Sequence, residues 1–107
     1  MILAPIEGTA QLVGGAWSIN TDRLIDCFIV QIILEATDTS NQFTFSITNK
    51  NSLTVYPRDE ERNSTVESKM NRTNLNIPVS GKYTLAIAGA TVVADTVKYL
   101  IQLREKE

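Results

Sequence analysis

The stretch DCFIVQIILEA, from Asp26 to Ala36, contains the most apolar run of the chain and decides the fold class. Its β-branched and aromatic residues crowd together from Phe28 to Ile33, which favours an extended strand. A helix over Thr21–Ala36 is the alternative, because Thr21 or Asp22 could cap its first turn. We expect the strand, since the residues between Phe28 and Ile33 are poor helix formers.

This strand is apolar on both faces. Strict alternation sends one set of side chains into the core: Phe28, Val30, Ile32 and Leu34. The opposite face then carries Cys27, Ile29 and Ile33, interrupted by Gln31. Two coverings are conceivable for that face, namely the chain's own segments (Met1–Ile6 or Ala90–Ala94) or a second protein chain. We expect the second chain, because an exposed apolar sheet face promotes association.

The same period-two alternation recurs along the chain. It is clearest in FTFSIT (Phe43–Thr48), GKYTLAI (Gly81–Ile87) and VKYLIQL (Val97–Leu103), which turn-forming residues separate. Short strands at regular spacing predict one domain over residues 1–107, an antiparallel β-sandwich or jelly-roll of about seven to nine strands. The predicted core consists of Phe28, Val30, Ile32, Leu34, Phe43, Phe45, Ile47, Leu75, Ile77, Tyr83, Leu85, Ile87, Tyr99 and Ile101.

A long polar stretch, PRDEERNSTVESKM, begins at Pro57 and predicts a protruding loop at residues 57–72, with a protruding hairpin as the alternative. Its charged run could suggest a metal site, but three consecutive acids on an extended chain point to alternate sides. We expect a solvated loop that becomes ordered against a neighbouring subunit. The candidate interface therefore comprises Cys27, Ile29, Ile33, Arg58, Asp59, Glu60, Glu61 and Arg62.

Catalytic chemistry has little support in the sequence. The chain has no histidine, which is the commonest general base and metal ligand. The one cysteine, Cys27, lies in the apolar strand, where we expect an inert buried thiol. We therefore expect no enzyme, no catalytic or metal-binding residues and no cofactor.

Two further clusters have a ligand-binding alternative. Oxygen atoms of Asp38–Gln42 could hold calcium, but a turn stabilised by Asp38 and Asn41 explains them better. Trp17 and Tyr56 could form a platform for a sugar ring. Because Trp17 alternates with Ile19, we expect it in the core instead.

Charge and composition limit the partners. A formal net charge of −2 gives no electrostatic footprint for nucleic acid. The run FIVQIIL is too short to span a membrane. The start MILAPIEG does not resemble a signal peptide, although the chain is rich in Thr, Asn and Ser like a protein of extracellular surfaces. A protein that leaves the cell by lysis, as part of a virus particle, could have a surface-type composition without a signal peptide. We therefore expect synthesis in a host cytoplasm and location in the virion.

The C-terminal segment IPVSGKYTLAI…TVKYLIQL (Ile77–Leu103) resembles the ending of small bacterial and phage β-sandwich modules. In these, a Gly-x-Tyr-x-Leu-x-Ile strand precedes a Tyr-x-Ile-x-Leu strand. Secreted protease-associated modules, carbohydrate-binding modules and small virion proteins of tailed bacteriophages share this pattern. Because no signal peptide is apparent, the chain looks most similar to the virion proteins, of the head decoration, head–tail or tail accessory type. The resemblance implies contacts with capsid or tail proteins and with copies of itself. A carbohydrate- or protein-binding module is the alternative, with a surface glycan as a further candidate partner.

Overall fold

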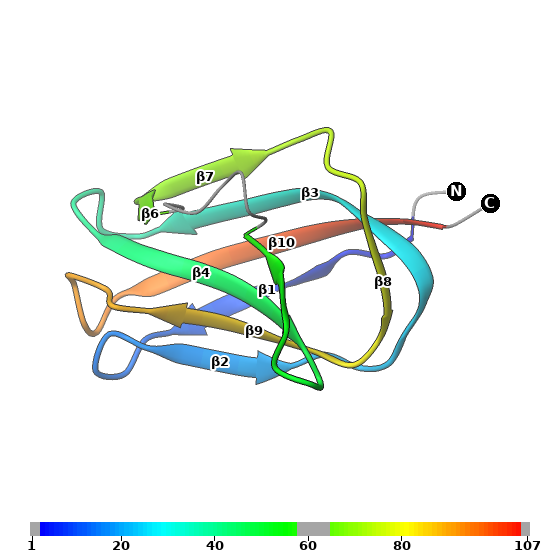
Figure 1. Ribbon diagram of the computed structural model, residues 1–107. Helices are drawn as coiled ribbons and strands as arrows, with labels where there is room; N and C mark the ends of the chain where they lie inside the picture. Colours follow the sequence, from blue (N-terminus) through cyan, green and yellow to red (C-terminus); the bar gives the residue numbers. More distant parts are fainter. Residues whose placement is uncertain (1–2, 58–64, 106–107) are drawn as a thin grey trace.

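The computed structural model describes residues 3–57 and 65–105, and these form strands and turns without a helix (Figure 1). The all-β prediction is confirmed, and the helical alternative for Thr21–Ala36 is wrong. The strands are β1 (Ile6–Gln11), β2 (Trp17–Asn20), β3 (Leu24–Ala36), β4 (Gln42–Asn49), β5 (Thr54–Tyr56), β6 (Thr65–Glu67), β7 (Lys69–Arg72), β8 (Ile77–Gly81), β9 (Tyr83–Ala88) and β10 (Thr96–Glu105).

Two antiparallel sheets pack face to face as a β-sandwich (Figure 1). The first sheet has β10 between β1 and β3, and the second has β9 between β4 and β2. Two short strands share the remaining edge of each sheet, since β3 pairs with β7 and β8 while β4 pairs with β5 and β6. The pairing of β6 with β7 joins the two sheets at one place.

Strands β6 and β7 correct the prediction of a loop, since they pair as a hairpin, but this hairpin joins the sheets through β4 and β3. Residues 65–72 are part of the sheets, and Val66 is buried in the core. Between the strands, the Ser68 amide donates to the Asn41 carbonyl and the Ser68 carbonyl accepts from the Ala36 amide. The rest of the predicted loop, residues 58–64, lies outside the described residues.

A β-bulge in β3 answers the question of its two apolar faces. Gln31 lies opposite Gln102 while Ile29 lies opposite Leu103, so Val30 is an extra residue in β3. An extra residue shifts the period-two alternation by one position. The side chains that face the core are therefore odd-numbered just before it and even-numbered after it. The core therefore receives Cys27 and Ile29 before the bulge, and then Ile32, Leu34 and Ala36 after it.

The prediction of strict alternation is consequently wrong in the first half of β3. Cys27 and Ile29 are each 2% exposed and belong to the core, whereas Phe28 and Val30 are only half-buried on the outer face. Arg104, on β10, covers the Phe28 ring from 5.2 Å. Apart from Phe28, Val30 and the half-buried Tyr99, the predicted core residues are all buried.

Tyr99 packs between the two sheets near their open edges. Its ring lies 5.0 Å from the ring of Trp17 on β2. The Tyr99 ring also lies over Gly8 on β1. A Cβ atom added to Gly8 would lie 2.7 Å from the Tyr99 hydroxyl. Trp17 is half-buried and Tyr56 fully buried against Phe45, so the two do not form a joint platform for a sugar.

Candidate interaction surface

The outer face of the first sheet has an apolar centre with a charged rim. Ile33 lies opposite Leu100 on β10, and both side chains are half-buried. A shallow hollow of about 390 Å³ lies over them. We call its six side chains on this face the outer patch: Glu7, Thr9, Ile33, Glu35, Lys98 and Leu100.

Cross-strand neighbours arrange the charges of the outer patch. Glu35 lies between Lys98 on β10 and Lys69 on β7. Its carboxylate is 4.0 Å from the Lys69 ammonium, and both side chains are exposed, so the pair contributes little to folding stability. Glu7 lies beside Leu100 on the other side. The patch therefore offers both signs of charge around two apolar side chains, an arrangement that suits a two-fold contact with a second copy.

The structure places the residues of the predicted interface in different environments. Ile33 is half-buried and lies in the outer patch, and its contact with a second subunit stays a prediction. Cys27 and Ile29 were expected beside it, but the bulge turns both into the core, so they offer no contact surface. The remaining members, Arg58 to Arg62, lie outside the described residues.

The Cys27 thiol is unsuited to nucleophilic chemistry. Burial raises its pKa, and the negative charge of Asp26 raises it further. Since the thiolate is the reactive form, a raised pKa keeps the group protonated and inert near neutral pH. Within residues 3–57 and 65–105, no three His, Cys, Asp or Glu side chains come together as metal ligands would. Asp38 Oδ1 accepts hydrogen bonds from the Ser40 amide and hydroxyl, which confirms the predicted turn.

A second hollow lies beside the bulge, where β3 changes its partner from β8 to β7. The segment between these two strands, residues 73–76, leaves the sheet there and is held by a hydrogen bond from the Leu75 amide to the Val30 carbonyl. The hollow of about 560 Å³ is lined mainly by amide side chains and Arg104. We call it the amide groove, and its polar side chains are Gln31, Thr73, Asn74, Asn76, Gln102 and Arg104.

Sequence reasoning missed Leu100 and the amide groove. The signal for Leu100 was present, because it is an apolar residue between the outward-facing Lys98 and Gln102 in VKYLIQL. The groove had no signal of its own. It exists because of the bulge and the gap between β7 and β8, neither of which alternation predicts.

No protein-family model and no curated protein matches this chain. In the described part of the chain, no helix has the length and apolar character needed to cross a membrane.

Proposed function

We propose that this chain is a non-enzymatic structural protein of a bacteriophage particle, of the capsid decoration, head–tail or tail accessory type. It acts through contacts between subunits. The observation that carries the proposal is the outer patch, where Ile33 and Leu100 form an apolar centre within a ring of mixed charges. The pattern of Ile77–Leu103 is compatible with this class, since small virion proteins share it with secreted protease-associated and carbohydrate-binding modules.

The outer patch has the composition of an interface core with a polar rim. Its partner is a second copy or another virion protein. In a two-fold contact, Lys98 of one copy would meet Glu7 or Glu35 of the other, while the Ile33–Leu100 pairs would pack at the centre. The patch alone is smaller than a stable interface, so we expect the contact to extend along the sheet.

Substitution of the apolar centre tests the contact. Ile33→Lys with Leu100→Lys should give a folded protein that no longer self-associates or binds particles, measured by size-exclusion chromatography with light scattering. Ile25→Lys is the matched control, because Ile25 is on the same strand, is 83% exposed and lies off the patch. Normal association of the double variant would contradict the proposal, as would equal loss in the control.

The viral assignment has its own test. Quantitative mass spectrometry of purified particles should find this chain in many copies per particle. Its absence from particles that are otherwise complete would overturn the assignment while leaving the outer patch as an interface.

The amide groove favours a second candidate function, the binding of a neutral glycan. Side-chain amides and Thr73 could donate to and accept from sugar hydroxyls. The Asn74→Gly variant tests this sharply, because Asn74 has a φ of 57° that glycine adopts without strain. Titration with a panel of neutral oligosaccharides should show weaker binding to the variant. No binding to the wild-type chain would exclude this function.

A further inference from the structure

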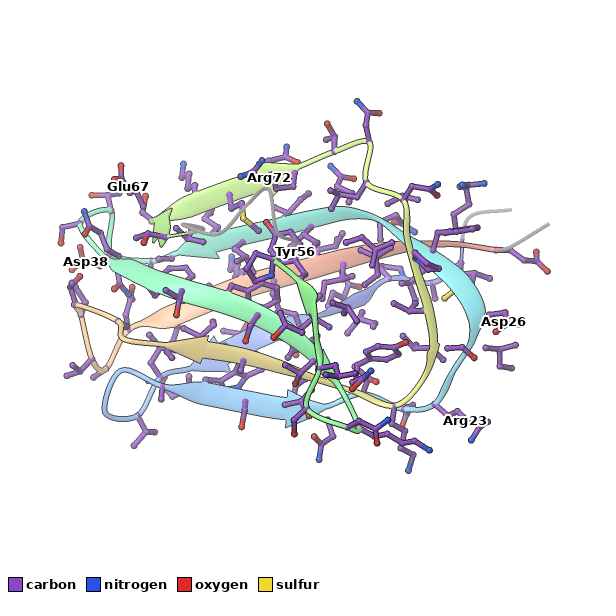
Figure 2. The ribbon with its side chains drawn as sticks, in the orientation of Figure 1. Arg23, Asp26, Asp38, Tyr56, Glu67 and Arg72 are labelled. Atoms are coloured by element: carbon purple, nitrogen blue, oxygen red, sulfur yellow. The ribbon has the colours of Figure 1, made fainter. Side chains whose placement is uncertain are left out.

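A basic pocket lies at the end of the sandwich opposite the Asp38 turn. Figure 2 shows Arg23 at this end and Asp38 at the other. The pocket has a volume of about 450 Å³ and takes a cationic side chain from each of three connections: Arg23 before β3, Lys50 after β4 and Lys82 between β8 and β9. Its other polar side chains include Asn49, Asn51 and Ser80.

Arg23, Lys50 and Lys82 form no ion pair with any described residue. The ion pair that lies within 4.0 Å among those residues is Lys69–Glu35. Among residues 3–57 and 65–105, no acidic side chain lines the pocket. The nearest acids in the sequence are Asp22, next to Arg23, and Asp26, which lines the adjoining hollow with Ser80 and Tyr83. Three unpaired cations around one hollow repel each other, and they do so in a chain whose formal net charge is −2. An anion in the pocket would relieve that repulsion.

Tyr83 fixes two of the three connections. Its hydroxyl accepts a hydrogen bond from the Ser80 amide at 2.8 Å and donates to the Ser80 carbonyl at 3.0 Å, which closes the turn that carries Lys82. Its backbone amide donates to Thr21 Oγ1 at 3.1 Å, and its carbonyl accepts from the Thr21 amide at 2.8 Å. Arg23 follows two residues later. One residue therefore holds both connections, the one with Lys82 through its side chain and the one with Arg23 through its backbone.

The third connection is fixed by Asn49. Its side-chain oxygen accepts from the amides of Asn51 and Leu53 at 2.9 and 3.0 Å, and its backbone amide and carbonyl bond Leu53 and Ser52. The turn that carries Lys50 is thus held by four hydrogen bonds of one residue. The backbone of the pocket is formed in advance, so a ligand would order only the ends of long side chains.

We propose that the basic pocket binds a tetrahedral oxyanion of the phosphate class. The Arg23 guanidinium suits two oxygens of such a group, while Lys50 and Lys82 supply point charges and the amide and hydroxyl side chains supply further donors. The site is separate from the outer patch and does not depend on the proposed structural role. The anion could be free phosphate or a phosphoryl group on a larger molecule.

Titration of the full chain with sodium phosphate, at an ionic strength held constant with sodium chloride, tests the site. Amide NMR shifts should saturate and concentrate at residues 49–51 and 80–82. Lys82→Gln should weaken the affinity about tenfold. Lys98→Gln, which removes the same charge from the outer patch, should leave the affinity unchanged. Shifts that do not saturate, or equal weakening by Lys98→Gln, would overturn the proposal.

A parallel titration with glycerol phosphate distinguishes the two sources of the anion. Tighter binding than inorganic phosphate would support the site and assign it to a phosphoryl group on a larger molecule. Weaker binding would support a site for the free anion. If neither probe binds, the pocket is no oxyanion site.

Discussion

The side-chain nitrogen of Asn41 donates a hydrogen bond to Asp95 Oδ2 across 3.0 Å, and Asn41 itself is fully buried. This contact ties the β3–β4 turn to the β9–β10 connection. Asn41 Oδ1 also accepts from the Val92 amide at 3.1 Å. Both ends of one amide therefore hold a connection in which Ala90 is the one buried apolar side chain.

Asn41→Ala should lower the free energy of unfolding by about 1–3 kcal/mol, because it removes the acceptor of the Val92 amide and one of the two donors to Asp95 Oδ2, the other being the Asp38 amide. Urea denaturation measures the change. Asn51→Ala is the control, since Asn51 is an exposed turn residue whose backbone amide, and not its side chain, makes the recorded hydrogen bond. A loss below about 0.5 kcal/mol for Asn41→Ala would mean that the connection is held by other contacts.

Acid should weaken the fold at the same place. Burial would raise the pKa of Asp95, but hydrogen bonds from Asn41 Nδ2 and from the amides of Asp38 and Thr96 outweigh burial and lower it. A carboxyl whose pKa is lower in the folded than in the unfolded state adds stability at higher pH, and that stability disappears on acidification. The loss should begin as the pH approaches the ordinary value of 3.8 and continue below it.

Denaturation curves across this pH range measure the effect. Asp95→Asn should be less stable than the wild type near neutral pH and should lose less stability on acidification. Parallel curves for the two proteins would contradict a role for Asp95, and would point instead to Asp38, whose pKa the Ser40 hydrogen bonds also lower.

Ile29 and Ile33 offer a matched comparison of the two faces of β3. Ile29→Ala should destabilise the fold by about 2–5 kcal/mol, because it opens a cavity in the core. Ile33→Ala should cost about 1 kcal/mol or less in the isolated subunit and should act mainly on association. Denaturation at low protein concentration measures both. Equal costs would mean that the bulge is not where the register places it.

Alternation predicted the sandwich and most of its core, because β4, β9 and β10 each keep one face buried over most of their length. It failed in β3, since period-two reasoning has no means of locating an extra residue such as Val30. It also failed at residues 65–72, where Val66 is the one fully buried apolar side chain in a polar pair of strands. Strands that are held by backbone pairing leave no hydrophobic pattern to recognise.

Because the Tyr99 ring lies over Gly8, we expect substitutions at these two positions to have coupled effects on folding stability. Gly8→Ala should destabilise the fold by about 1–3 kcal/mol, since the new methyl group would displace the Tyr99 ring from Trp17. Tyr99→Phe removes the hydroxyl that the methyl group would meet first. The cost of Gly8→Ala should therefore be smaller in the Tyr99→Phe background, which denaturation followed by the fluorescence of Trp17 would measure. Additive costs would show that the two residues are independent.

The extra residue in β3 makes this strand two half-strands in opposite phase. Between Asp26 and Val30, the odd-numbered residues Cys27 and Ile29 face the core; after Val30, the even-numbered residues Ile32, Leu34 and Ala36 do. Deleting Val30 would bring both halves into one phase, so that either Cys27 and Ile29 or Ile32 and Leu34 would have to point into water. A substitution at Val30 changes one side chain, whereas a deletion there would turn half of the central strand inside out. We therefore expect the length of this segment to be far less tolerant of change than its composition.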